Sequence, residues 1–187
     1  MPAGFEYWAS PLPGLLVFQR SPVHDPRGGF DRLFDSVVVG AAGAEAEVRQ
    51  VNLASNRARG TIRGLHYQAR PHSETKVVTC LRGRAFDVVV DIREGSPTFL
   101  ESHAEMLSPD ASKTIVIPPG FAHGYQTMED DTDLLYLHSG GFVDNAQRGL
   151  HPLDDSLGII WPLAPVIISE RDSQHPLIVG GWEGVQP

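Results

Sequence analysis

The 187-residue sequence predicts an all-β fold, a sandwich or barrel built from short strands. The first observation behind this prediction is that β-rich runs recur at a spacing of roughly 8–12 residues, which is typical of those two architectures. The second is that the 19 glycines and 15 prolines suit many turns better than long helices. In chain order, the expected strands lie within residues 14–20, 48–55, 61–68, 75–83, 84–92, 113–120, 123–128 and 133–139.

Two of these strands are expected to pair directly. Residues 75–81 and 85–92 are separated by a short connection that contains Gly83, a pattern that indicates a β-hairpin. In the second strand Asp87 and Asp91 interrupt an apolar run four residues apart, so they share one strand face. We expect a solvated face or a turn-capping position there, with a site role for Asp87 as the alternative.

Helical patterning is weak, and only two short helices are expected. Residues 154–159 and 169–174 are the best candidates, with Ser169 able to cap the second. The sequence contains no internal repeat, low-complexity segment or linker, so we expect a single domain over residues 1–187. The tail after about Leu177 is expected to be peripheral.

Composition and charge exclude several classes of protein. No run approaches the roughly 18 apolar residues of a membrane span, and the first residues do not resemble a secretory signal, so we expect a soluble, cytoplasmic protein. A net charge of −8 argues against nonspecific nucleic-acid binding, although a few clustered arginines could hold a small anion. The only cysteine, Cys80, excludes an intrachain disulfide and is expected to be buried.

Three histidines, His66, His72 and His123, lie where they could do chemistry. In an all-β chain, the glycine-rich motif at His66 and the PxGxxH motif ending at His123 are typical of cupins, which are double-stranded β-helices or jelly rolls. Metal-binding cupins carry a second histidine two residues after the first, but here that residue is Gln68, and only Glu74 follows it. Zn and Fe sites need three or more imidazole, carboxylate or thiolate ligands, so we expect no metal.

A set of motifs in one order makes the resemblance specific. The motifs are DPRGGF (25–30), QVNLASN (50–56), RGLHYQ (63–68), Lys76, DVVVDIREGSPTF (87–99), LSPD (107–110), IPPGFAHGY (117–125), LLY (134–136), IIWP (159–162) and ISERD (168–172). Together, across about residues 10 to 176, they resemble the dTDP-4-dehydrorhamnose 3,5-epimerase family. The resemblance implies a cupin-like fold, a homodimer, and no metal or other cofactor.

The resemblance also implies a reaction, which is inversion of carbons next to the ketone of a nucleotide-linked 4-keto-6-deoxy sugar. By similarity, His66 is the base that removes the proton from C3 or C5, Asp172 is the carboxylate paired with it, and Tyr136 is the acid. Inversion needs both groups, because a single base acting on one face would restore the starting configuration. A tyrosine is protonated at neutral pH and can donate, whereas a neutral histidine can accept.

The substrate-binding residues are implied in the same way. Lys76 could stabilise the enolate, and the guanidinium groups of the arginines suit the oxygens of a nucleotide diphosphate. The positions that match family binding residues are Arg27, Gln50, Asn52, Arg63, Lys76, His123, Phe142 and Arg171.

The chain departs from the family pattern at several of these places. Arg32 stands where an acidic contact is usual, Phe142 replaces a tyrosine, Gln147 replaces a glutamate, and HPLDD (151–155) replaces a tryptophan-containing stretch. These changes concern the nucleotide and the sugar rather than the proton transfers. Epimerases that act only at C3 or only at C5, or on another nucleotide, are therefore alternatives.

Two alternatives of other classes remain open at this stage. One is a metal-dependent cupin enzyme that uses His66 and His123, and the other is a noncatalytic module that binds a sugar nucleotide. Taken singly, the residues also have structural interpretations. His66 could be a core histidine, Tyr136 a strand-packing residue and Asp172 a helix cap, and the arginines could be surface charges.

Overall fold

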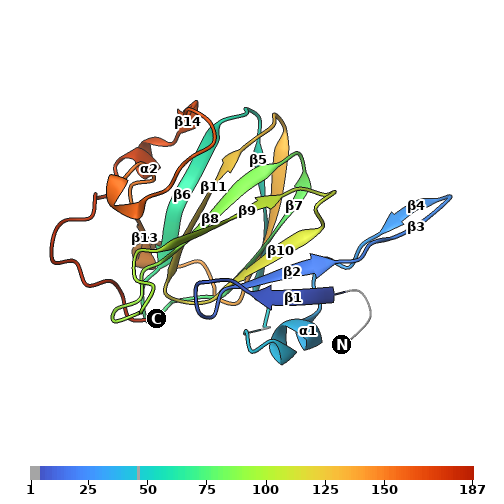
Figure 1. The fold of residues 1–187 in the computed structure, drawn as a ribbon, viewed down its shortest axis with the longest axis horizontal. Helices are drawn as coiled ribbons and strands as arrows, with labels where there is room; N and C mark the ends of the chain where they lie inside the picture. Colours follow the sequence, from blue (N-terminus) through green and yellow to red (C-terminus); the bar gives the residue numbers. More distant parts are fainter. Residues whose placement is uncertain (1–4, 46) are drawn as a thin grey trace.

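The computed structural model describes residues 5–45 and 47–187, so residues 1–4 and 46 of the expected domain lie outside the described residues. Two antiparallel sheets face each other (Figure 1). In spatial order, the first consists of β1 (Phe5–Ala9), β2 (Leu16–Arg20), β10 (Lys113–Ile117), β7 (Lys76–Arg82), β12 (Thr132–His138) and β5 (Gln50–Asn56).

The second sheet is built around β6, β11 and β8. Its spatial order is β13 (Gln147–Gly149), β6 (Thr61–Gln68), β11 (Phe121–Thr127), β8 (Ala85–Asp91) and β9 (Ser102–Leu107), and β14 (Ile167–Ile168) pairs in parallel with β6. All eight expected strands are present, and the all-β prediction is confirmed. Six strands were not expected: β1, β9, β13, β14, and the hairpin of β3 (Val23–Asp25) and β4 (Gly28–Phe30).

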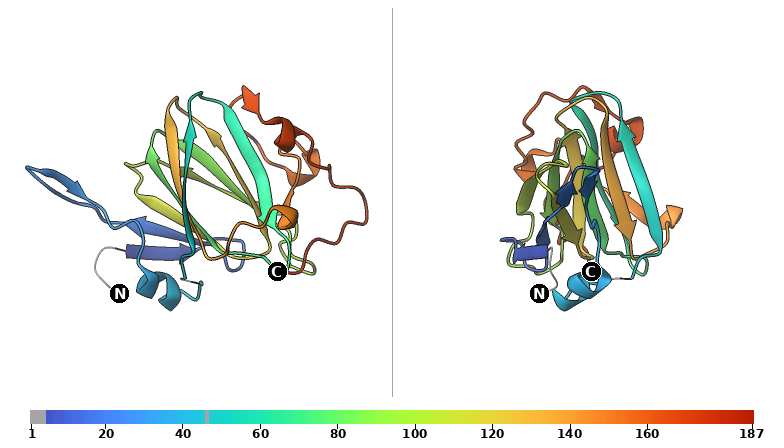
Figure 2. Two further views of the ribbon diagram at one scale, coloured as in Figure 1. Left: turned by 180° about the vertical axis from the view of Figure 1, so that it is seen from behind. Right: turned by 90° about the vertical axis from the view of Figure 1, so that its right-hand side faces the viewer.

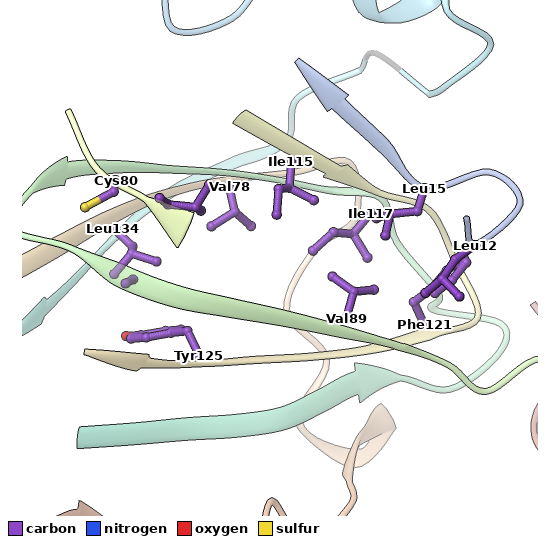
Figure 3. Close-up of a cluster of buried hydrophobic side chains, with 12 residues drawn as sticks. Leu12, Leu15, Val78, Cys80, Val89, Ile115, Ile117, Phe121, Tyr125 and Leu134 are labelled. Atoms are coloured by element: carbon purple, nitrogen blue, oxygen red, sulfur yellow. The ribbon is translucent and has the colours of Figure 1, made fainter. Parts of the chain in front are cut away.

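The core fills the space between the two sheets. Val78, Ile115 and Leu134 project from the first sheet toward Val89 and Tyr125 of the second, and all five are almost fully buried (Figure 3). Burial of such a cluster stabilises the fold because apolar surface leaves water. As expected, Cys80 is buried in this cluster, and burial raises the pKa of its thiol to about 11.

The outer face of the second sheet is also covered. Leu65, Val88 and Val90 point away from the first sheet and form a second cluster with the C-terminal part of the chain. Ile178 and Trp182 of the tail pack against this cluster. The tail therefore runs along the periphery, as expected, but it is anchored there.

The prediction that residues 75–81 and 85–92 pair as a β-hairpin is wrong. β7 pairs with β10 and β12, whereas β8 pairs with β11 and β9 in the other sheet. The connection thus crosses between sheets, and Gly83 in it adopts φ +71°, with Thr132 packed where a side chain would begin. Local sequence cannot distinguish a crossing from a hairpin here, because both strands are apolar and the turn residue is the same.

The expectation of a solvated face at Asp87 and Asp91 is also wrong, since both side chains are fully buried. Asp91 caps the turn after β8, as the other part of that prediction proposed, by accepting hydrogen bonds from Arg93, Ser96 and Thr98. Asp87 instead lies beside His123.

The helices are short and few in the described residues. Ser169 caps α2 (Glu170–Ser173) by accepting a hydrogen bond of 3.1 Å from the Asp172 amide, as predicted. Residues 155–157 form the 3-10 helix η2 (Asp155–Leu157), a second is η1 (Asp144–Ala146), and α1 (Ser36–Ala41) was not expected. Within the described ranges, no helix has the length and apolar character needed to cross a bilayer.

The hairpin of β3 and β4 forms an arm that projects from the body of the molecule (Figures 1 and 2). All of its strand residues are exposed, including Val23 and Phe30. Arg27 lies at the turn of this arm, where it forms an ion pair with Asp25.

Candidate active site

A cavity of about 390 Å³ opens between the two sheets. One wall comes from β5, β7 and β12 of the first sheet and the other from β6 and β11 of the second. The lining residues are Gln50, Asn52, Leu53, Ala54, Arg63, His66, Gln68, Glu74, Lys76, His123, Tyr125, Tyr136, His138, Phe142 and Gln147. The cavity is thus rich in groups that can titrate or form hydrogen bonds.

His66 on β6 is paired with a buried carboxylate. Its Nε2 lies 2.7 Å from Asp172 Oδ1, and its side chain is 32% exposed while that of Asp172 is 5% exposed. Burial by itself raises the pKa of Asp172, but the hydrogen bonds from His66 and from the Gly64 amide lower it below the ordinary aspartate value. The carboxylate therefore stays charged and orients the imidazole, with Nε2–H as donor and Nδ1 as acceptor.

A bulge in β6 explains why Arg63 and His66 line the same cavity. Side chains an odd number of residues apart in a regular strand point to opposite faces. Here His123 of β11 pairs with His66, whereas Tyr125 pairs with Arg63, so β6 has one extra residue and the face switches. Gly64 lies in this bulge at φ +122°, where an added Cβ would lie 2.6 Å from Gly124 Cα.

A second histidine–aspartate pair lies beside the first. His123 is directly opposite His66 across the β6–β11 ladder, and its Nε2 lies 2.8 Å from Asp87 Oδ2. Both side chains are buried. Sequence reasoning gave Asp87 a site role only as the alternative, because Asp87 and Asp91 lie four residues apart on one strand face and matched a solvated face or a turn cap. The pairing of Asp87 with His123, on a strand far along the chain, could not be read from that pattern.

Tyr136 reaches the cavity from the opposite sheet. It lies on β12, paired with Asn52 of β5, and its ring is 5.8 Å from the His123 ring and stacked on that of His138 at 5.8 Å. Burial, together with the charge of Asp87, raises its pKa well above the ordinary tyrosine value. The phenol therefore keeps its proton at neutral pH and can act as a donor.

A lysine and a glutamate lie at the edge of the cavity. Lys76 Nζ donates to the His66 carbonyl oxygen at 3.2 Å and lies 3.9 Å from Glu74 Oε1. Glu74 Oε2 in turn lies 3.1 Å from His138 Nδ1. Burial lowers the pKa of Lys76, although the neighbouring Glu74 opposes that shift. The ammonium of Lys76 thus lies close to the backbone of His66.

Arg63 is held at the cavity by neutral groups. Its Nε donates to Asn56 Oδ1 at 2.8 Å, and the Tyr125 hydroxyl donates to the same oxygen at 3.1 Å. No carboxylate lies within ion-pair distance of Arg63 in the described part of the chain. Its charge is consequently available to an anion in the cavity.

Most of the expected site residues come together, and two do not. His66, Tyr136 and six of the eight expected binding residues line the cavity, with Asp172 directly behind His66. Arg27 lies on the projecting arm, and Arg171 lines a second cavity on the other side of α2. Sequence reasoning did not assign Leu53, Ala54, Tyr125 and His138 to the site, although the first three lie within the motifs QVNLASN and IPPGFAHGY; only His138 lies outside every motif.

One group of side chains could hold a metal ion among the described residues. It consists of His66, Asp172 and His175, whose ligand atoms lie within 4.8 Å of one another. His123 does not belong to it, so the pairing of His66 with His123 in a metal centre finds no support in this geometry.

Comparisons with known proteins identify the same family as the sequence motifs, over nearly the whole chain. The family model described as dTDP-4-dehydrorhamnose 3,5-epimerase matches residues 9–179. A dTDP-4-dehydrorhamnose 3,5-epimerase from Streptomyces griseus is 42% identical over 166 residues, which are 87% of this chain and 82% of that protein.

Two solved structures share the fold. RmlC from Legionella pneumophila, a dTDP-6-deoxy-D-glucose-3,5-epimerase in complex with dTDP-4-keto-L-rhamnose, has a TM-score of 0.88 and 31% identity, covering 92% of this chain and 92% of that chain. ChmJ from Streptomyces bikiniensis is a 3'-monoepimerase solved with dTDP as a double mutant, histidine to asparagine and tyrosine to phenylalanine. It has a TM-score of 0.82 and 33% identity, covering 90% of this chain and 85% of that chain. The chain belongs to the dTDP-4-dehydrorhamnose 3,5-epimerase family, with the cupin-like fold that its sequence predicted.

Proposed function

We propose that this enzyme inverts C3, C5 or both in a dTDP-linked 4-keto-6-deoxy sugar, without a metal or other cofactor. The observation that carries the proposal is that His66 and Tyr136 come from facing sheets and line one cavity. A sugar ring between the sheets meets a proton acceptor on one face and a proton donor on the other, which is what inversion needs.

His66 is the base in this reaction. The ketone makes the neighbouring C–H acidic, and Nδ1, the ring nitrogen that Asp172 does not engage, takes the proton. The resulting imidazolium is stabilised by the buried Asp172 carboxylate 2.7 Å from Nε2. The negative charge of the enolate needs a nearby positive charge, and Lys76 and Arg63 are the cationic side chains that line the cavity.

Tyr136 returns a proton to the opposite face. Its raised pKa keeps the hydroxyl protonated until the enolate carbon takes the proton. Support for the two roles comes from ChmJ, since the histidine and tyrosine altered in its double mutant are separated by the same interval as His66 and Tyr136. ChmJ is a 3'-monoepimerase and RmlC is a 3,5-epimerase, so the number of inverted centres is left open in the proposal.

The nucleotide lies, in this proposal, toward Arg63 and the amides of Gln50 and Asn52 on β5. The dTDP found in the structures of RmlC and ChmJ supports a thymidine nucleotide. Phe142, 59% exposed at the rim, offers an aromatic face to the ligand. Arg171 does not line this cavity but the second one, so the proposal gives it no direct contact with the ligand in its own subunit.

We further propose a homodimer of single-domain subunits, acting in the cytoplasm. Exposed apolar side chains on the arm and on the edge strand β5 support the dimer: Val23, Phe30, Val51 and Leu53 are each at least 60% exposed. Arg27 would reach a diphosphate only in the cavity of the partner. The single cysteine is an unpaired buried thiol, which is compatible with a reducing compartment.

Solvent deuterium exchange tests the proposed reaction. The enzyme is incubated in heavy water with dTDP-, CDP- and GDP-linked 4-keto-6-deoxy sugars, and deuterium at C3 and C5 is measured by NMR. We expect incorporation at one or both carbons with the dTDP sugar and a loss of about 10²–10⁴-fold in His66→Ala.

The exposed His72→Ala is the matched control and should exchange like the wild type. Absence of exchange with all three sugars would contradict the proposal. Tight binding without exchange would identify a noncatalytic binding module instead.

A further inference from the structure

We propose that His66, Asp172 and His175 form an inhibitory binding site for a divalent transition metal ion, for which Zn²⁺ is the best match. Asp172 Oδ1 lies 2.7 Å from His66 Nε2 and 3.7 Å from His175 Nε2. All three ligand atoms lie within 4.8 Å of one another. The carboxylate oxygen is thus shared between two imidazoles, one of which has no role in the proposed reaction.

The Nε2 atom of His175 is buried and makes no hydrogen bond with the described residues. The side chain as a whole is 12% exposed. The ring packs where a side chain at residue 149 would begin, so Gly149 makes room for it. Buried polar atoms are nearly always paired, and a bound cation is one way to satisfy this nitrogen.

The donor set matches zinc. Zn²⁺ binds imidazole nitrogen and carboxylate oxygen at roughly 2.0–2.2 Å in a tetrahedron, which places neighbouring ligand atoms roughly 3.3 Å apart. The two distances to Asp172 Oδ1, 2.7 and 3.7 Å, bracket that spacing, and the two imidazole nitrogens, which lie within 4.8 Å of each other, would close on the ion by side-chain rotation. Ca²⁺ and Mg²⁺ prefer oxygen ligands and are poorer matches.

The cluster lies in the wall between two cavities. His66 lines the active-site cavity, and His175 lines a second cavity of about 340 Å³ that also contains Arg148 and Arg171. The two arginines oppose a cation, and Asp172 is the only carboxylate in the cluster. Because one carboxylate faces two nearby arginines, we expect the metal to bind weakly enough to be released, rather than to be held permanently.

Binding of the metal would inactivate the base. The inhibitory effect rests on the proposed function, in which Nε2–H donates to Asp172 and Nδ1 accepts the substrate proton. A metal ion can bind Nε2 only in the other neutral tautomer, in which the ring proton has moved to Nδ1, so the nitrogen that should accept the substrate proton already carries one. The metal also takes the Asp172 oxygen that would stabilise the imidazolium.

Zinc titration of the full-length protein tests the proposal. Calorimetry with ZnCl₂ alone should show saturable binding, and added zinc should stop deuterium exchange until EDTA restores it. His175→Ala should exchange like the wild type without zinc. It should bind zinc at least about tenfold more weakly, since loss of an outer-shell partner alone costs about 10–100-fold in metal affinity.

His175→Asn is the second variant, since it keeps a polar side chain over Gly149 and should show the same weakening. His72→Ala is the matched control for an exposed histidine and should bind zinc like the wild type. Absence of zinc binding by the wild type, or unchanged zinc binding and inhibition in both His175 variants, would overturn the proposal. If the wild type shows no exchange but binds zinc through His175, only the proposed function fails.

Discussion

Tyr136 illustrates how the surroundings of one side chain select its role. Its ring lies between His123 and His138, and burial together with the charge of Asp87 raises its pKa well above the ordinary tyrosine value. A phenol in this environment is poor at losing a proton to water, but it can donate to a carbanion held against it. In the proposed reaction, the side chain would therefore act after the base has created that carbanion.

Replacement of this hydroxyl separates the two halves of the reaction. Tyr136→Phe keeps the ring and its stacking but removes the donor, so deuterium exchange by His66 should stay within about tenfold of the wild type. Formation of the inverted sugar should fall by about 10²–10⁴-fold. NMR of the product in heavy water measures both quantities. Equal loss of exchange and inversion would show that Tyr136 is needed for proton removal as well.

At the scale of the element, the bulge in β6 aligns two side chains that a regular strand would separate. Arg63 and His66 share the cavity only because β6 has one residue more between them than β11 has between their partners His123 and Tyr125. Gly64 makes this possible through its positive φ and its close approach to Gly124. The RGLH motif was recognised in the sequence, but the bulge was not, because it depends on the backbone of a strand far along the chain.

Gly64→Ala tests the bulge. A side chain at φ +122° and 2.6 Å from Gly124 Cα should destabilise the fold by about 1–3 kcal/mol, and it should lower the exchange rate because His66 moves. Urea unfolding and the exchange assay measure the two effects. Gly180→Ala is the control, because its Cβ meets nothing within 4 Å and its stability should change by less than about 0.5 kcal/mol.

The turn after β8 depends on the charge of Asp91. Its buried carboxylate accepts from Arg93 at 2.6 Å, Ser96 at 2.6 Å and Thr98 at 2.7 Å. Burial opposes ionisation, but these hydrogen bonds prevail and lower the pKa of Asp91 below its ordinary value. An aspartate with a lowered folded-state pKa adds stability above its unfolded-state pKa of about 4, and that stability is lost as the pH falls through the folded-state pKa.

Asp91→Asn should therefore lower the free energy of unfolding by about 3 kcal/mol at pH 7, because the partly buried guanidinium of Arg93 loses its buried counter-charge. The difference from the wild type should shrink as the pH falls below about 4 and vanish below the lower folded-state pKa, where the wild-type carboxylate is also neutral. Urea unfolding at several pH values measures this. The exposed Asp110→Asn should show no such difference, and a gap that stayed constant into acid would contradict the assignment.

At the scale of the whole molecule, the sequence predicted strands better than their pairing. Apolar runs bounded by turn residues identified the eight strands, because each buried strand needs apolar side chains within its own short segment of sequence. Whether β7 meets β8 or crosses to the other sheet depends on contacts far along the chain. The same limit applies to the site: motifs placed His66, Tyr136 and Asp172 in one reaction, but they carried no signal for the His123–Asp87 pair or for His175 behind the dyad.

Arg27 gives a prediction about the assembled molecule. Its side chain is 90% exposed on an arm that projects from the body of the molecule (Figure 1) and does not line the cavity of its own subunit, yet its motif matches a binding position. If the arm completes the cavity of a partner subunit, the protein is a dimer by light scattering, and both Arg27→Ala and His66→Ala are weakly active alone. Mixing the two variants after unfolding and refolding together should restore activity.

The amount of restored activity follows from the symmetry of the dimer. In a random mixture half of the dimers are mixed, and each has one cavity with an intact His66 that receives the intact Arg27 of its partner. The mixture should therefore reach about a quarter of the wild-type exchange rate. If Arg27 serves its own subunit, every cavity in the mixture still lacks either Arg27 or His66, and the rate stays at the average of the two variants. The measured rate thus assigns Arg27 to one cavity or the other.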